Sequence, residues 1–224
     1  MYNQEVAQTR PVYGSSFVSK VMFFFGLAVA ASAAGAFVGL NYLIPFFLSN
    51  TAFIYLLIIA ELGLILTSQW WSKTTPLNYI LFTIFAVITG ITLVPVLAYF
   101  LESAAGVDIL IKAFGATALM FGAAAVFGHT THFNLQGLRG FLMMSLIGMI
   151  VVSVIGIFVP WSNTFEMIFS GIGVVLFSAY TMYDMQKLKS YPEDMYILAA
   201  MSLYLDIFNL FLYILRLLAA LNRR

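Results

Sequence analysis

The chain contains no cysteine, only two histidines and few charged residues. The lack of cysteine excludes disulfides, iron–sulfur clusters, thiolate zinc sites and a cysteine nucleophile, and it leaves the redox compartment open. Charged residues make up 8% of the 224 positions and hydrophobic residues 62%. Soluble domains have about 25% charged and about 45–50% apolar residues. A soluble core could not bury this excess of apolar side chains, so the composition predicts a membrane protein.

The few charges and histidines do not form a recognisable binding site. The formal net charge is +1 and the basic residues are spread along the chain, so nucleic acid is not an expected partner. His129 and His132 form an H-x-x-H pair, but zinc needs three or four ligands. We interpret this pair as part of a polar loop at the membrane surface, and we expect no cofactor.

Seven apolar stretches of membrane-spanning length alternate with polar or proline-containing breaks. They cover residues 21–43, 52–69, 77–101, 109–127, 138–159, 165–183 and 195–218. Seven spans use about 140 residues, which leaves too few for a separate soluble domain. We therefore predict an all-α membrane protein with a polar tail over residues 1–20, a seven-helix domain over residues 21–219 and a basic end over residues 220–224.

Two local patterns predict how the spans pack. Ala31, Gly35 and Gly39 form a ladder of small residues at four-residue spacing, which lets the backbones of neighbouring membrane helices approach closely. Pro95 lies inside the third stretch and predicts a kink there, because proline removes a helical hydrogen bond.

The basic residues predict the orientation, because cytoplasmic loops of membrane proteins have an excess of Lys and Arg. If the N-terminus is cytoplasmic, most basic residues lie on the cytoplasmic side. The acidic Glu102 and Asp108 then lie on the other side, together with Lys112, which is one turn inside the fourth stretch. Arg223 and Arg224 conflict with this pattern after seven spans. The cytoplasmic set is Arg10, Lys20, Lys73, Arg139, Lys187 and Lys189.

The last stretch has one polar stripe on an otherwise apolar helix. Successive members of the stripe are four, three, four and three residues apart, which places them on one helical face. This pattern predicts a centrally packed helix whose stripe faces a cavity or polar groups of other helices. The alternative is a hydrogen-bonded stripe that only holds helices together. The stripe consists of Ser202, Asp206, Asn209, Tyr213 and Arg216.

Asp184 lies near the end of the sixth stretch, which is an antiparallel neighbour of the seventh. Asp206 is about 18 Å into the seventh helix, so the two meet only if the end of the sixth is buried or tilted inward. Two carboxylates that meet in a low dielectric cannot both ionise easily and share a proton. Such a pair is a pH-sensitive latch. The alternative is an interfacial Asp184 paired with Lys187 or Lys189.

Glu61 lies at the centre of the second stretch and is too deep to reach the membrane surface. A carboxylate at that depth is costly and is a functional candidate by default. It needs a partner such as Arg216, a hydroxyl or a proton. Its role is either that of an ion-pathway carboxylate or that of a member of a structural ion pair.

Three segments resemble the transmembrane Bax-inhibitor-motif family: GITLVPVLAYF at 90–100, FSAYTMYDMQKL at 177–188 and MSLYLDIFNLFLYILRLL at 201–218. The resemblance implies six helices in two three-helix layers around a central C-terminal helix. It also implies a passive, pH-dependent calcium leak gated by an aspartate pair, which falls on Asp184 and Asp206. The buried second-helix acid of bacterial members falls on Glu61. Bacterial relatives can have an arginine cluster at the cytoplasmic end of the second helix. In this chain the corresponding segment is SQWWSK at 68–73, whose only basic residue is Lys73.

Calcium takes about 6–8 oxygen ligands, whereas a leak needs only weak, transient ligation. We expect Asp184, Asp206 and Glu61 to act as transient calcium ligands, with calcium ions, protons and membrane lipids as partners. An enzyme is not expected, because both histidines lie in one interfacial loop. The other open reading is a regulatory or scaffold protein that binds a membrane protein such as a protease or stress-response factor. The composition favours a bacterial plasma membrane.

Overall fold

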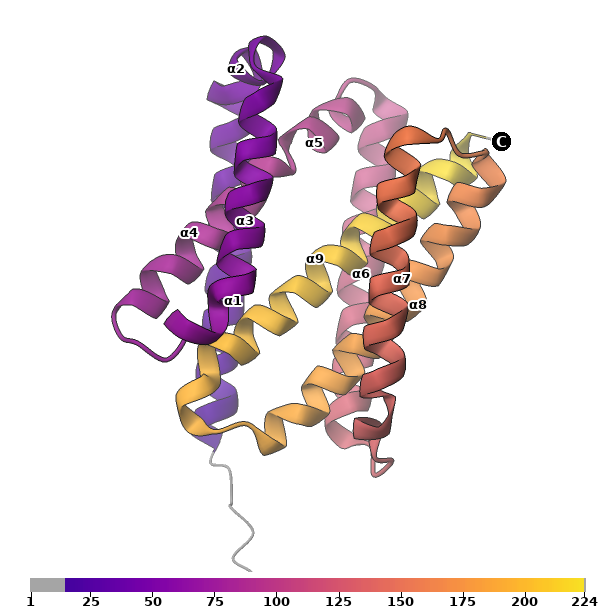
Figure 1. The fold of residues 1–224 in the computed structure, drawn as a ribbon. Helices are drawn as coiled ribbons and strands as arrows, with labels where there is room; N and C mark the ends of the chain where they lie inside the picture. The colour runs from indigo at the N-terminus through magenta and orange to yellow at the C-terminus, as the bar shows by residue number, and fades with distance from the viewer. Residues whose placement is uncertain (1–14, 224) are drawn as a thin grey trace, which may run out of the picture.

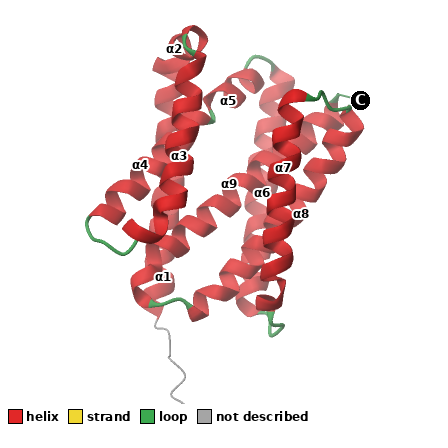
Figure 2. Ribbon diagram, in the orientation of Figure 1, coloured by secondary structure: helices red, strands yellow, loops and turns green. Residues whose placement is uncertain are grey.

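The computed structural model describes residues 15–223, except for the side chains of residues 15, 48 and 51. The predicted tail up to residue 14, including Arg10, and Arg224 lie outside the described residues. Within them the regular structure is entirely helical and there is no strand (Figure 2). The α-helices are α1 (Ser15–Val38), α2 (Ile44–Ser49), α3 (Thr51–Trp71), α4 (Leu77–Thr92), α5 (Val94–Leu101), α6 (Ala104–Thr130), α7 (Arg139–Phe158), α8 (Asn163–Lys187) and α9 (Tyr196–Asn222).

Seven helical segments of the described chain are long and apolar enough to span a membrane. Each overlaps one predicted stretch, so the all-α, seven-span fold class is confirmed. The segments are Ser16–Phe47, Ala52–Trp71, Leu77–Leu101, Ala104–Thr130, Leu135–Phe158, Asn163–Ser190 and Glu193–Asn222.

Two prolines have different effects on their helices. Pro45, where we expected a break, lies in the first turn of α2, and the first span continues through the π-helical turn Gly39–Leu43. Proline is tolerated in a first turn because its missing N–H has no intrahelical acceptor there. Pro95 is in the first turn of α5, and the helix breaks at Leu93 between α4 and α5 (Figure 1). The predicted kink in the third span is confirmed.

The small-residue ladder of α1 packs against α4 and α5. A Cβ atom on Gly35 would collide with the backbone of Val87, and one on Gly39 would collide with the Val94 side chain. On α4, Gly90 makes the reciprocal approach to the backbone of Ser32. The ladder thus allows the close helix packing that its spacing predicts.

Helix α9 lies in the interior of the bundle. It is the most buried of the seven spans and makes extensive contacts with α8, α6 and α1 and a smaller contact with α4. Figure 1 shows it crossing obliquely, with α1, α3 and α4 toward one side and α6, α7 and α8 toward the other. This agrees with the central packing that we predicted for the last helix. The arrangement of the other six spans in two layers of three stays a prediction.

The loops that contain the predicted cytoplasmic lysines and arginine lie at one end of the bundle. The start of α1 and the α3–α4, α6–α7 and α8–α9 connections are at the lower end in Figure 1, and the C-terminus is at the upper end. Lys73 forms an ion pair with Asp194 at 3.2 Å, and the hydroxyls of Tyr79 and Tyr196 are 2.8 Å apart. These two contacts, which we call the clasp, join the start of α9 to α4 and to the loop before it.

Candidate functional site

A cavity of about 680 Å³ lies between α3, α7, α8 and α9. We call it the carboxylate cavity because Asp184 of α8 and Asp206 of α9 both line it. Its α3 wall is apolar, whereas oxygen-bearing side chains are concentrated on α8 and α9. The polar lining residues are Ser153, Tyr180, Asp184, Ser202, Asp206, Asn209 and Tyr213.

Four of the five residues in the predicted α9 stripe face this cavity. They run from Ser202 to Tyr213, and between them the Asn209 amide donates to the Leu205 carbonyl at 2.7 Å. Arg216 does not line the cavity: it is exposed, and its guanidinium lies 5.9 Å from the ring centroid of Tyr213. The cavity therefore ends at Tyr213, one turn before the arginine.

The two aspartates are buried without strong partners. Asp184 is 8% exposed and Asp206 is 5% exposed, and the Oδ2 atom of Asp206 is buried with no hydrogen-bond partner. Within residues 15–223, neither carboxylate has a basic group at ion-pair distance. A buried carboxylate oxygen without a donor is costly, so this oxygen is available to a proton or a cation.

The lysines near Asp184 do not neutralise it through direct ion pairs. Lys187 attracts Asp184 electrostatically, but its ammonium group lies over the ring of Tyr191, 4.6 Å from the centroid. Lys189 donates to the backbone carbonyl of His129 instead. The interfacial pairing that we considered for Asp184 is therefore not formed.

The end of α8 is buried, which is the condition for Asp184 to approach the centre of α9. Leu188 and Tyr191, which follow α8, pack in one core cluster with Phe17 and Val21 of α1. These contacts exclude solvent from the α8–α9 connection. Asp184 consequently lies in the interior rather than at the bundle surface.

Tyr213 closes one end of the carboxylate cavity. Its ring stacks on Phe177 with centroids 5.6 Å apart, and it occupies the space next to Gly173 of α8. A Cβ atom at position 173 would collide with this ring, so glycine makes room for it. The Ser153 side chain of α7 interacts with Tyr213 from the other wall.

Glu61 lies apart from the two aspartates. Leu62, Ile65 and Leu66 of α3 line the carboxylate cavity, but Glu61 does not. It is half-buried and accepts a hydrogen bond of 2.8 Å from the Thr92 hydroxyl, which links α3 to α4. Of the partners considered for Glu61, the structure therefore has a hydroxyl and not Arg216.

Two polar residues near these carboxylates did not figure in the sequence analysis. Ser153 lines the cavity and Thr92 binds Glu61. Each is a hydroxyl residue within an apolar stretch, and this contrast is a signal in the sequence by which they could have been found. Within residues 15–223 no group of three or more His, Asp or Glu side chains forms a metal cluster. His129 lies in the last turn of α6, and His132 lies in the loop that follows.

The fold and the cavity define a class: polytopic membrane proteins with a pair of buried acids where two antiparallel helices meet. The chain belongs to the family described as inhibitor of apoptosis-promoting Bax1, whose family model matches residues 14–223. The family resemblance of the three segments is confirmed.

Relatives from other organisms match most of the chain. An uncharacterized protein of Campylobacter jejuni is 31% identical over 222 residues, covering 99% of this chain and 96% of the relative. The inner membrane protein YbhL of Escherichia coli is 34% identical, covering 79% of this chain and 77% of the relative. Bax inhibitor 1 of Schizosaccharomyces pombe is 32% identical, covering 80% of this chain and 63% of the relative.

Proposed function

We propose that the protein is a passive, pH-sensitive cation leak of the bacterial inner membrane, with calcium as a transported ion. In this proposal the pair Asp184 and Asp206 senses protons and gates the path. The observation that supports it is that both carboxylates line one cavity and that neither forms an ion pair with a residue in the described range 15–223. The location follows that of the E. coli relative, which is named an inner membrane protein.

The charge of the carboxylate cavity favours cations. Among residues 15–223, its lining has two acidic side chains and no basic one. Calcium is a hard cation that prefers oxygen ligands, and the lining offers carboxylate, amide and hydroxyl oxygens. Because these oxygens lie on several helices rather than in one compact cluster, ligation is weak enough for the ion to leave.

The gate follows from the packing around the pair. Helices α8 and α9 make the most extensive helix contact, whereas α3 and α7 cover the cavity with little contact to α9. A proton shared between the aspartates lowers their repulsion, and loss of that proton places two negative charges in a low dielectric. The change in repulsion moves α8 and α9 relative to α3 and α7, the loosely attached walls of the cavity. This movement changes the width of the ion path.

The proposed role is transport rather than catalysis. The two histidines of the chain do not line the carboxylate cavity, so a histidine base is not positioned there. Glu61 does not line the carboxylate cavity and is hydrogen-bonded to Thr92 of α4. We assign it to the support of α3 against α4 rather than to the gate.

Calcium entry into liposomes tests the proposal. Purified protein is reconstituted in liposomes with a trapped calcium dye, and entry is followed from roughly pH 5 to pH 9. We expect entry above that of empty liposomes, with a rate that depends on pH. Entry no faster than in empty liposomes at every pH would contradict the leak. Retention of one membrane-protein partner during purification would then favour the regulatory or scaffold function.

A further inference from the structure

A second cavity, of about 320 Å³, lies where α5, α8 and α9 meet near the C-terminus. We call it the arginine cavity because Arg216 and Arg223 both line it. The α5 side consists of Pro95, Val96, Tyr99 and Phe100, and α8 contributes Glu166. It belongs to the opposite end of the bundle from the clasp, and the proposed leak does not use it.

The two arginines differ in their partners. Arg223 forms an ion pair with Glu166, with 2.9 Å between Nη1 and Oε2. Within residues 15–223, Arg216 has no carboxylate at ion-pair distance, and its guanidinium lies over the Tyr213 ring. The cavity therefore has one uncompensated positive charge.

Arg216 lies in the last two turns of α9. It is six residues before the last residue of α9, or about 9 Å along the helix. An arginine side chain at that depth extends toward the membrane surface, where the phosphate groups of lipids lie. Tyr99, on the α5 wall, is 61% exposed, and tyrosine is typical of this interfacial layer.

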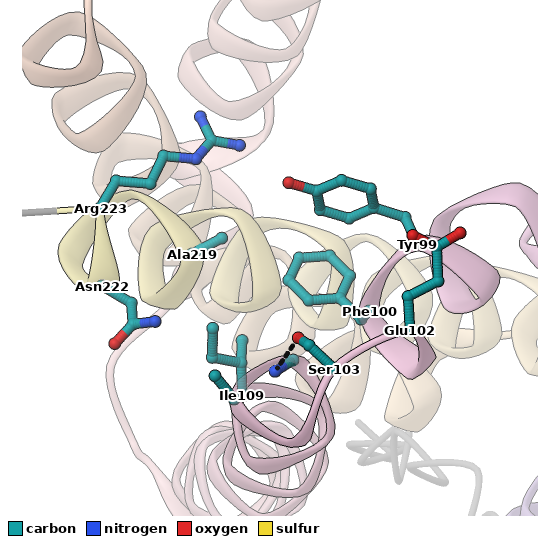
Figure 3. Close-up of a pocket in the computed structure, with 10 residues that line it drawn as sticks. Tyr99, Phe100, Glu102, Ser103, Ile109, Ala219, Asn222 and Arg223 are labelled. Atoms are coloured by element: carbon teal, nitrogen blue, oxygen red, sulfur yellow. Dashed lines mark hydrogen bonds between the residues drawn. The ribbon is translucent and has the colours of Figure 1, made fainter.

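Two polar side chains besides Arg216 and Glu166 line the cavity, those of Tyr99 and Arg223. Figure 3 shows the adjoining cavity of about 250 Å³, where the Tyr99 and Arg223 side chains extend toward each other above Phe100 and Ala219. Both cavities share these four residues. A group held by Arg216 thus has a hydroxyl donor and a second guanidinium in the same lining.

We propose that the arginine cavity binds a phosphate group, supplied by a membrane lipid headgroup or by free phosphate at that surface. Guanidinium groups bind phosphate through paired, charge-assisted hydrogen bonds. Arg216 is the principal ligand, and Arg223 and Tyr99 are additional donors. The site also accounts for basic residues at an end of the bundle where the positive-inside pattern predicts few: Glu166 neutralises Arg223, and the phosphate neutralises Arg216.

Native mass spectrometry of the full chain tests this site. The detergent-solubilised protein is titrated in separate arms with phosphatidylglycerol, with diacylglycerol, which lacks the phosphate, and with inorganic phosphate. The variants are Arg216→Gln, Arg216→Lys and the control Arg139→Gln, which removes an exposed arginine at the other end of the bundle. Thermal unfolding of each variant checks that it is folded.

We expect phosphatidylglycerol to bind and diacylglycerol not to bind. Arg216→Gln weakens binding roughly tenfold, because a charge-assisted hydrogen bond is lost. Arg216→Lys keeps the charge and stays closer to the wild type, and Arg139→Gln equals the wild type. Displacement of the lipid by inorganic phosphate would assign the site to free phosphate, and no displacement assigns it to the headgroup. Unchanged binding in folded Arg216→Gln, or equal binding of diacylglycerol, would overturn the proposal.

Discussion

Asp184 and Asp206 face one cavity from two antiparallel helices, and within residues 15–223 no basic side chain forms an ion pair with either. One oxygen of Asp206 is buried and has no hydrogen-bond donor. Two such groups can keep a shared proton or bind a cation, and both states lower their mutual repulsion. Competition between protons and cations for the same oxygens follows from this arrangement.

Calcium binding should therefore strengthen as the pH rises. A carboxylate must lose its proton to ligate a metal, so protons displace calcium at low pH. We expect the rise in Tm caused by calcium to grow from acidic to alkaline pH in the wild type. Asp206→Asn should abolish the rise, whereas Asp108→Asn, which affects an exposed acid paired with Lys112, should keep it. A calcium effect that is equal at all pH values would contradict the competition.

The bond between Thr92 and Glu61 should stabilise the packing of α3 against α4. Thr92→Val removes the hydroxyl that donates to the half-buried Glu61 carboxylate. We expect it to lower the free energy of unfolding by about 1–3 kcal/mol, measured by chemical unfolding in detergent. Thr92→Ser keeps the hydroxyl and should lie closer to the wild type. Equal stabilities of the valine and serine variants would show that the bond contributes nothing.

The sequence predicted the seven spans and the helix break near Pro95, because each depends on local apolarity or on proline. It also predicted that the α9 stripe faces a cavity or polar groups of other helices, and in the structure the residues from Ser202 to Tyr213 face a cavity. A helical repeat identifies a common face but not where a cavity along it ends. For that reason the sequence could not show that Arg216, unlike the other stripe residues, lies outside the cavity.

The position of Glu61 could not be predicted from its own helix. Leu62 and Leu66, its near neighbours in sequence, face the carboxylate cavity, whereas Glu61 points to Thr92 of another helix. Choosing between these two faces requires the packing of α3 against α4. The burial of Asp184 likewise depends on α1, whose Phe17 and Val21 pack near the end of α8.

Close packing of α1 against α4 should make Gly90 sensitive to substitution. A methyl group at position 90 would collide with backbone atoms of Ser32, which cannot rotate away. We expect Gly90→Ala to lower the free energy of unfolding by about 1–3 kcal/mol. Gly148→Ala is the matched control, because a Cβ atom there has no neighbour within 4 Å. Similar unfolding midpoints for the two variants would contradict this packing.

Lys73 should not take part in the pH response. It pairs with Asp194 in the clasp, and both side chains are well exposed, at 43% and 55%. Lys73→Gln should therefore change the free energy of unfolding by less than about 1 kcal/mol. The pH dependence of calcium entry should be that of the wild type. A shifted pH profile would mean that Lys73 acts on the aspartate pair.

The most direct test of the gate is the pH profile of calcium entry into liposomes for Asp184→Asn and Asp206→Asn beside the wild type. Asparagine keeps the shape of the side chain but cannot exchange a proton. The account predicts that each substitution fixes the entry rate, high or low, across the pH range in which the wild-type rate changes. A variant that keeps the wild-type pH profile would contradict the assignment of the gate to this pair.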